Sequence, residues 1–393
     1  MEEVVIVSYA RSAMGKSFRG GFNATHGAVL AAPVIREVVN RSLIEEDRVD
    51  DVILGCGFPE GATGFNIARQ SALAAGLPEG VAAMTVNRFC SSGLEAIAIG
   101  AQRILAGEAE VVVAGGVESI SCVQRHTNAY MSEEGALKRR VPAIYWPMLQ
   151  TAEEVARRYG VDKASQDAFG VRSQQLAAAA QARGVFREEI VPVLTEMMLF
   201  DPETKKEAGS RRITVDTDEG IRSSTTLEVV AGIRPALDGG VVTAGNSSQF
   251  SDGAAAVVLM RARRAEKLGL EPLGRYRGYA VAGCAPDIMG IGPVHAVPKL
   301  LARTCLRVDD IDLWELNEAF AVQVLHCADT LGIPTERLNV NGGAIALGHP
   351  YGVSGARLVG SGLREARRRR SKYLVSTMCV AGGMGAAALF EAC

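Results

Sequence analysis

Residues 85–116 read TVNRFCSSGLEAIAIGAQRILAGEAEVVVAGG, and the character of this stretch changes three times. A β-prone segment ends at Asn87, and a single cysteine, Cys90, follows a short turn. From Ser91 onward apolar residues recur every three or four positions, which is typical of an amphipathic helix. A second β-prone run then leads into Gly115-Gly116. The stretch therefore predicts a strand, a helix and a strand, with Cys90 at a helix N-terminus, where N–H groups favour a thiolate.

The composition describes a globular protein with many tight turns. Of its 393 residues 48% are hydrophobic and 43 are glycine, which suits close backbone approaches in an α/β fold. The formal net charge of -2 provides no field for nucleic acid, so no nucleic-acid partner is expected. Apolar runs such as 254–260 are too short to span a bilayer. The cysteines show no metal-ligand spacing, and the acidic N-terminus lacks a signal-peptide pattern. We expect a cytoplasmic protein without a metal or a membrane span.

Alternating strand and helix patterns divide the chain into two similar halves. Val86-Asn87 in the first half matches Val340-Asn341 in the second, and each half has a strand that leads to a Gly-Gly pair. This repetition indicates a weak internal duplication. Strands are predicted at 4–7, 49–55, 84–87, 110–114, 190–192, 211–216, 254–260, 312–316 and 373–378, and helices at 28–39, 65–75, 91–106, 151–159, 163–183, 318–331 and 354–368. We expect an α/β protein with three parts: residues 1–118 with 246–270, an inserted loop domain at 119–245, and a second half at 271–393.

Three other stretches contain reactive side chains. His349 lies in NGGAIALGHPYGVSGAR (341–357), Cys379 in STMCVAGGMGA (376–386), and Asn317 in WELNEAF (314–320). Taken singly, each residue has an ordinary structural explanation. His349 would be a satisfied core or surface histidine, Cys379 a buried thiol like Cys90, and Asn317 a helix N-cap.

Taken together, these stretches resemble the signatures of the thiolase family over essentially the whole chain. The segment TAGNSSQFSDGAAA from Thr243 also resembles the loop domain of that family. The resemblance implies a duplicated thiolase-like fold, in which two similar α/β halves pack together around an inserted loop domain. It implies that coenzyme A cleaves a 3-ketoacyl-CoA into acetyl-CoA and a shortened acyl-CoA, and that the reverse condensation also occurs. Coenzyme A would be a co-substrate, and no permanently bound cofactor is implied.

The resemblance also assigns a role to each reactive residue. Cys90 would be the nucleophile that carries the acyl group, and His349 the base that activates it. Cys379 would exchange the proton of the substrate α-carbon. Asn317 would hold a water beside His349 at one oxyanion site, and the backbone N–H groups of Cys90 and Ala381 would form the other. Many family members have glycine at the position of Ala381, so alanine would be strained there if φ were positive.

Five further residues match ligand contacts of the family. Ser248 and Arg222 would contact coenzyme A. Met148, Met289 and Phe320 would line the acyl pocket, where flexible methionines suit a variable chain. Ordinary core packing explains the last three residues equally well.

Several alternatives remain open. A decarboxylating ketosynthase pairs its nucleophile with two histidines, or with histidine and asparagine, so Cys379 argues against it. A non-catalytic acyl-CoA or lipid carrier on this fold would be expected to lose the nucleophile. Within the family, VNRFCSSG favours a 3-ketoacyl-CoA thiolase of fatty-acid beta-oxidation over a biosynthetic acetyl-CoA acetyltransferase. Residues 123–148 depart from the longer loop of biosynthetic tetramers, so we expect a homodimer in preference to a homotetramer.

Overall fold

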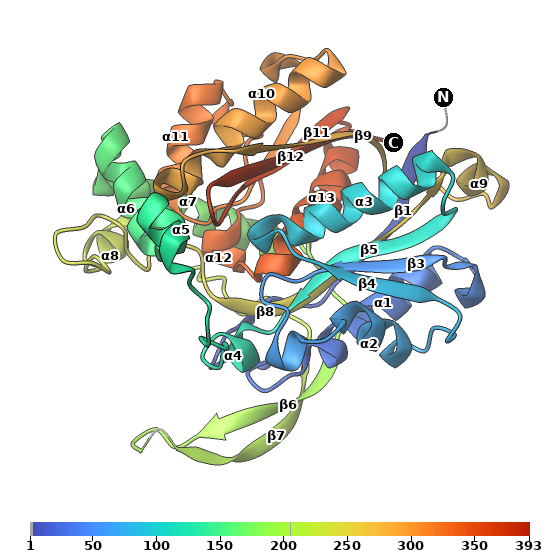
Figure 1. Cartoon of the computed structure of the whole chain (residues 1–393), viewed down its shortest axis with the longest axis horizontal. Coiled ribbons are helices and arrows are strands. Elements are labelled where there is room, and N and C mark those ends of the chain that lie inside the picture. The colour runs from blue at the N-terminus through green and yellow to red at the C-terminus, as the bar shows by residue number, and fades with distance from the viewer. Residues whose placement is uncertain (1–2, 205) are drawn as a thin grey trace.

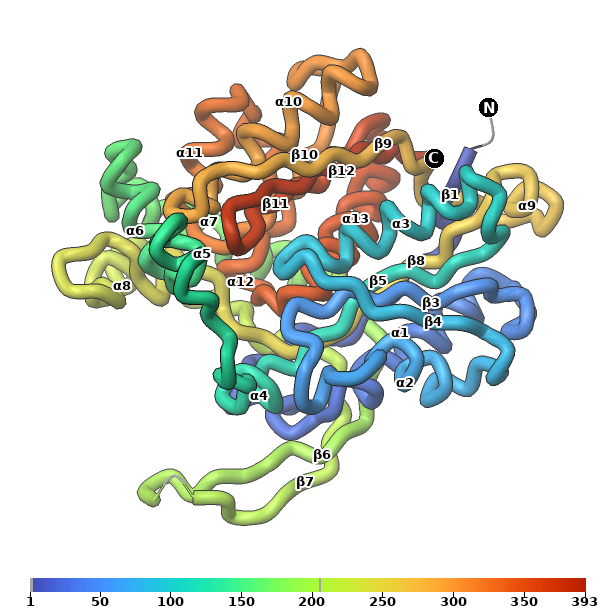
Figure 2. Tube along the Cα trace, viewed as in Figure 1, coloured from blue at the N-terminus to red at the C-terminus, as the bar shows by residue number. Residues whose placement is uncertain are grey.

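The computed structural model describes residues 3–204 and 206–393, and one large mixed sheet runs through both halves of it (Figure 1). Its strands are β1 (Val4–Arg11), β2 (Gly15–Lys16), β3 (Asp51–Gly55), β4 (Ala82–Val86), β5 (Val111–Glu118), β8 (Ser251–Arg261), β9 (Gly274–Gly283), β10 (Leu313–Leu316), β11 (Tyr373–Val380) and β12 (Met384–Ala392). The strand order is β10-β11-β12-β9-β1-β8-β5-β3-β4, and β2 pairs with β8. Figure 2 shows how the chain passes from one half of this sheet to the other.

The pairing pattern confirms the internal duplication. In the first half β3 is parallel to β5, which is antiparallel to β8. In the second half β10 is parallel to β11, which is antiparallel to β12. The parallel pair β3–β4 has a counterpart in the isolated parallel bridge between Trp314 and Leu338. The two halves thus repeat one α/β unit, and antiparallel pairing of β1 with β9 joins their sheets.

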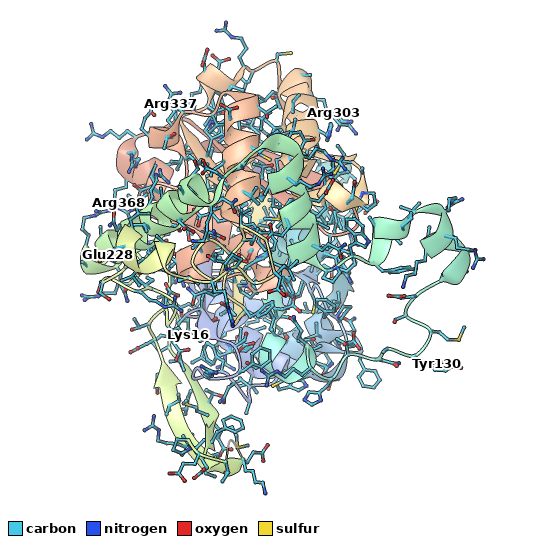
Figure 3. All side chains as sticks on the ribbon, turned by 90° about the vertical axis from the view of Figure 1, so that its left-hand side faces the viewer. Lys16, Tyr130, Glu228, Arg303, Arg337 and Arg368 are labelled. Carbon is cyan, nitrogen blue, oxygen red and sulfur yellow. The ribbon has the colours of Figure 1, made fainter. Side chains whose placement is uncertain are left out.

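The segment between β5 and β8 forms a separate group of elements. It contains α4 (Ile120–Val123), α5 (Gly135–Arg140), α6 (Met148–Tyr159), α7 (Lys163–Ala182) and α8 (Leu227–Ala231). It also contains a ribbon of β6 (Val193–Phe200) and β7 (Glu207–Val215), which projects from the body (Figure 1). Of the residues predicted to be extended at 190–192, Ile190 forms an isolated parallel bridge with Arg11, and β6 begins only at Val193. Figure 3 shows Tyr130 on a second projecting segment, between α4 and α5.

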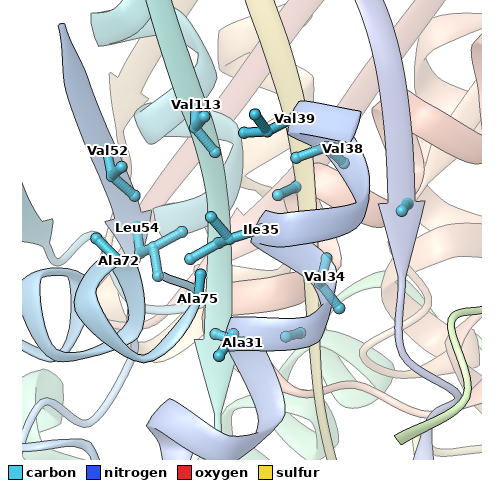
Figure 4. Packing of buried hydrophobic residues seen from close by; sticks show 14 of the residues in the cluster. Ala31, Val34, Ile35, Val38, Val39, Val52, Leu54, Ala72, Ala75 and Val113 are labelled. Carbon is cyan, nitrogen blue, oxygen red and sulfur yellow. The ribbon is translucent and has the colours of Figure 1, made fainter. Parts of the chain in front are cut away.

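The helices form three layers with the strands between them. The remaining helices are α1 (Gly27–Arg41), α2 (Ile67–Ala74), α3 (Ser92–Ala106), α9 (Ala262–Lys267), α10 (Gly292–Thr304), α11 (Ala321–Leu331), α12 (Ala344–Leu347) and α13 (Tyr351–Arg369). One core lies between α1, α2 and the strands of the first half, where Ile35 and Ala72 pack over Leu54 and Val113 (Figure 4). A central core joins α3 and α13 to the strands of both halves. A third core lies under α10 and α11.

Several elements differ from the sequence-based prediction. Helix α2 begins at Ile67 and not at residue 65, because the Asn66 side chain caps it by accepting from the Arg69 N–H at 3.3 Å. Strands β9 and β12 and helix α10 were not predicted. About half of the residues in each strand are glycine or alanine, which have weak β propensity, and pairing with neighbouring strands makes them extended. Along the described residues no helix is long and apolar enough to cross a bilayer.

Candidate active site

Cys90 lies on a strained turn at the start of α3. The turn is a short 3-10 helix, η3 (Phe89–Ser91), and Phe89 has a left-handed φ of 43°. The Ser92 hydroxyl stabilises this turn, since it accepts from the Arg88 N–H at 2.8 Å and donates to the Phe89 carbonyl at 2.6 Å. The predicted helix is confirmed, and Cys90 precedes its first turn as a half-buried free thiol.

Two glycines let the central helices α3 and α13 touch through their backbones. A Cβ atom added to Gly93 would lie 2.5 Å from the Gly352 carbonyl oxygen, and one added to Gly355 would lie 2.3 Å from a backbone nitrogen of α3. No other residue type permits this approach without a shift. Because the contact lies in the first turns of both helices, it brings the turn of Cys90 next to the turn that carries His349.

Hydrogen bonds at both ring nitrogens fix the His349 side chain. Nδ1 lies 2.6 Å from the Ser354 hydroxyl, which itself donates to the Pro350 carbonyl at 3.2 Å. The hydroxyl proton is thus engaged, so we assign the imidazole proton to Nδ1. Nε2 then presents a lone pair, and Asn317 Nδ2 lies 3.4 Å from it. Ser354 was not among the predicted site residues, although its place in the first turn of the helix after His349 was a signal.

The surroundings hold His349 and Cys90 in their neutral forms. Burial, followed by the nearby Arg357 charge, lowers the pKa of His349 to about 3. Burial raises the pKa of the Cys90 thiol to about 12, although the N–H groups of Ala381 and of Cys90 itself act in the opposite direction. Desolvation therefore outweighs the helix N–H groups that favour a thiolate at this position. A base must remove the Cys90 proton during the reaction.

The second cysteine is the penultimate residue of β11, and this strand packs against the turn that carries Cys90. Cys379 is fully buried, and burial followed by the proximity of Cys90 raises its pKa well above the usual range. Two residues later, the Ala381 N–H donates to the Cys90 sulfur. Positive φ values occur at Gly382 (81°) and Gly383 (84°) but not at Ala381. Alanine is therefore accommodated without the strain that a positive φ would cause.

Asn317 directly follows β10 and does not cap a helix. Its backbone N–H donates to the Thr377 carbonyl at 3.0 Å, and its carbonyl accepts from Gln323 Nε2 at 2.8 Å. Helix α11 begins after Phe320, whose position makes it the N-cap. The buried Asn317 Oδ1 has no hydrogen-bond partner within residues 3–204 and 206–393. This acceptor is available to a donor from water or a ligand.

The predicted acyl-pocket residues gather around Cys379. Met289, Ala319 and Cys379 form one buried cluster, and the half-buried Met148 and Phe320 pack against it. Three residues from distant parts of the chain thus lie at one of the two cysteines. The three predicted residues thus pack beside Cys379, and their role as the lining of an acyl pocket stays a prediction.

The two predicted coenzyme A contacts differ in their positions. The half-buried Ser248 donates its backbone N–H to the Ala319 carbonyl at 3.0 Å, so it lies beside this cluster. Arg222 follows β7, and its side chain is exposed. Its backbone N–H donates to Gln174 Oε1 of α7 at 2.8 Å. Ser248 thus lies at the site, whereas Arg222 lies on the surface of the segment between β5 and β8.

Comparisons with known proteins agree with this geometry. The description "Thiolase, N-terminal domain" matches residues 4–263, and "Thiolase, C-terminal domain" matches residues 270–392. The chain is 46% identical to the 3-ketoacyl-CoA thiolase of Bacillus subtilis, with 100% of both chains covered. It superposes with a TM-score of 0.89 on the Bacillus anthracis acetyl-CoA acetyltransferase (38% identity; 100% and 99% covered). The dimeric peroxisomal thiolase of Saccharomyces cerevisiae also gives 0.89 (38% identity; 99% and 97% covered). The chain belongs to the thiolase family of acyltransferases.

Proposed function

We propose that the chain catalyses the reversible, coenzyme A-dependent cleavage of 3-ketoacyl-CoA into acetyl-CoA and a shortened acyl-CoA. The observation that carries this proposal is the convergence of four reactive side chains at one place. Cys90 receives a hydrogen bond from the Ala381 N–H, Cys379 lies next to it, and His349 faces Asn317. The B. subtilis relative, named a 3-ketoacyl-CoA thiolase, supports the substrate class.

Cleavage begins with transfer of the Cys90 proton to His349. The sulfur attacks the 3-keto carbonyl, and the N–H groups of Cys90 and Ala381 stabilise the oxyanion. The bond between the α- and β-carbons then breaks, and its electron pair leaves with the acetyl-CoA enolate. The enolate oxygen is held beside His349 and Asn317, while Cys379 protonates the α-carbon. Acetyl-CoA leaves, and the acyl group remains on Cys90 as a thioester.

A second molecule of coenzyme A completes the cycle. The Cys379 thiolate removes the proton of the CoA thiol, whose sulfur attacks the thioester on Cys90. Cys90 leaves and recovers its proton from His349, so both residues return to their starting states. Burial opposes the first proton transfer, from Cys90 to His349, and favours the return, because a low His349 pKa makes the imidazolium a ready proton donor. A thiolate with a strongly raised pKa, such as Cys379, is a base strong enough for the carbon acid of the reverse condensation.

We also propose degradation of fatty acids by beta-oxidation as the direction in the cell, and a homodimer as the assembly. The relatives with 3-ketoacyl-CoA thiolase and dimeric thiolase in their names support these choices. The similarity to the Bacillus anthracis acetyl-CoA acetyltransferase supports the alternative, a biosynthetic acetyl-CoA acetyltransferase. The three-part division of the chain, the homotetramer alternative and the cytoplasmic location stay predictions from the sequence, and the yeast neighbour is peroxisomal. The coenzyme A contacts of Ser248 and Arg222 are likewise proposed.

The test is the rate of thiolysis as a function of acyl-chain length. We expect kcat/KM with saturating coenzyme A to hold or rise from acetoacetyl-CoA to longer 3-ketoacyl-CoA substrates. Activity confined to acetoacetyl-CoA would instead identify an acetyl-CoA acetyltransferase. The variant Cys90→Ala should form no acyl-enzyme while retaining its affinity for coenzyme A. No thiolysis at any length by the unmodified protein would favour the carrier alternative.

A further inference from the structure

Tyr351, two residues after His349, packs its ring against the imidazole. The two ring centroids lie 5.2 Å apart with an interplanar angle of 86°. The Phe58 ring lies 5.6 Å from the Tyr351 ring at 59°. The Tyr351 hydroxyl donates to Gln124 Oε1 at 3.0 Å. The His349 imidazole therefore contacts the Tyr351 ring, which Phe58 and Gln124 hold in place.

The hydrogen bonds of His349 leave one motion of its ring unrestrained. The two bonds join Nδ1 to Ser354 and Nε2 to Asn317, and the lone pair and N–H of an imidazole point along its plane. Such bonds resist movement within the ring plane more than a tilt of the ring out of that plane. A perpendicular aromatic ring blocks that motion, and edge-to-face contact is a favourable arrangement of two aromatic rings. Tyr351 has this geometry.

Tyr351 is itself held in place, so its ring can restrain the His349 imidazole. Its backbone position is tight, because a Cβ atom added to Gly57 would lie 2.7 Å from the Tyr351 Cβ atom. Burial, followed by the nearby Cys90 and Glu118, raises the pKa of Tyr351, so the hydroxyl keeps its proton for Gln124. Gln124 follows α4 and begins the projecting segment that carries Tyr130 (Figure 3).

We propose that Tyr351 is a positioning residue that holds the His349 imidazole at the angle needed to accept the Cys90 proton, and that Gln124 anchors Tyr351. The inference rests on the proposed role of His349 as the base. Neither residue exchanges a proton with substrate. Their contribution is to the alignment of Nε2, and misalignment of a proton acceptor lowers the rate of the step without weakening substrate binding.

The experiment compares variants that keep or remove the ring. Tyr351→Leu should lower kcat about 30-fold while KM changes by less than about twofold, since alignment affects the chemical step. Tyr351→Phe and Gln124→Leu keep both rings and lose only the anchor, so each should lower kcat about threefold. The double variant Tyr351→Phe/Gln124→Leu should be no slower than either single variant, because both remove the same hydrogen bond. The rate of Cys90 acylation in a single turnover should fall in parallel with kcat.

Tyr276→Leu is the matched control. The Tyr276 ring also makes an edge contact, with Phe390 at 6.0 Å and 71°, but in the central core away from His349. We expect it to lower Tm without changing the single-turnover acylation rate. Equal loss of acylation in Tyr276→Leu and Tyr351→Leu, or a Tyr351→Leu variant with unchanged kcat, would overturn the inference. An unchanged kcat in Gln124→Leu would remove the anchoring role, and this variant tests it even if Tyr351→Leu does not fold.

His349→Ala separates this inference from the proposed function. Full activity in His349→Ala would refute the proposed base, and the positioning role would fail with it. An inactive His349→Ala together with a fully active Tyr351→Leu would refute only the positioning role.

Discussion

Replacing Ser354 with alanine tests whether the hydroxyl sets the proton position on His349. The change removes the 2.6 Å contact to His349 Nδ1 and the 3.2 Å hydrogen bond to the Pro350 carbonyl. Both residues are buried, since Ser354 is 1% exposed and His349 is 3% exposed. A buried donor left without a partner costs about 1–3 kcal/mol, so the free energy of unfolding should fall by that amount.

The kinetic effect follows from the same hydrogen bond. If the bond favours the Nδ1–H form by about 1.4 kcal/mol, its loss reduces the fraction of His349 with a free Nε2 lone pair about tenfold. We therefore expect Ser354→Ala to lower kcat for thiolysis about tenfold at saturating substrate, with a small change in KM. Ser354→Thr keeps the hydroxyl and should recover most of the rate.

Ser361→Ala is the control within the same helix. The Ser361 hydroxyl donates to Glu189 at 2.8 Å and contacts the Tyr9 hydroxyl at 3.1 Å, away from His349. Urea unfolding should show a comparable loss of stability in both alanine variants, while kcat falls only in Ser354→Ala. If Ser354→Ala lowers the free energy of unfolding but leaves kcat unchanged, the Ser354 hydroxyl does not set the position of the proton on His349.

Three further predictions concern the helix contact, the pH dependence and the second cysteine. Gly355→Ala should cost about 1–3 kcal/mol of unfolding free energy and lower kcat, because its new Cβ meets α3 at 2.3 Å. The control Gly80→Ala, whose Cβ would have nothing within 4 Å, should change neither the unfolding free energy nor kcat. Equal effects of the two variants would contradict the close contact between α3 and α13. The native His349 pKa of about 3 lies below the ordinary 6.5, so between these values only the unfolded chain binds the proton. The contribution of His349 to the free energy of unfolding is therefore fully present above pH 6.5. It decreases as the pH is lowered below 6.5, by at most about 1.4 kcal/mol per pH unit. Urea unfolding at pH 7, 6 and 5 should show a smaller slope in His349→Gln, and identical slopes would argue against a neutral native imidazole. Cys379→Ser should still acylate Cys90 but slow both cleavage and condensation by orders of magnitude, and failure to acylate would show that the roles of the two cysteines overlap.

The sequence alone determined most of the secondary structure around the site. The repeat of apolar residues after Ser91 predicted α3, whose C-cap Gly107 has a φ of 81°, and the matching motifs of the second half predicted α13 and β11. These features depend on local periodicity and turn chemistry, which neighbouring residues encode directly. The four motifs, read together, also identified Cys90 and His349 as candidates.

The tertiary structure decided the protonation states and the supporting contacts. A helix N-terminus favours a thiolate, but burial by distant segments reverses that preference at Cys90. Ala381 fits because the positive φ values fall on the two glycines after it, which a residue pattern does not specify. Ser354 and Tyr351 support His349 only because the first turn of α13 folds back on the imidazole. Desolvation and contacts between side chains depend on how the whole chain packs, and no local pattern encodes them.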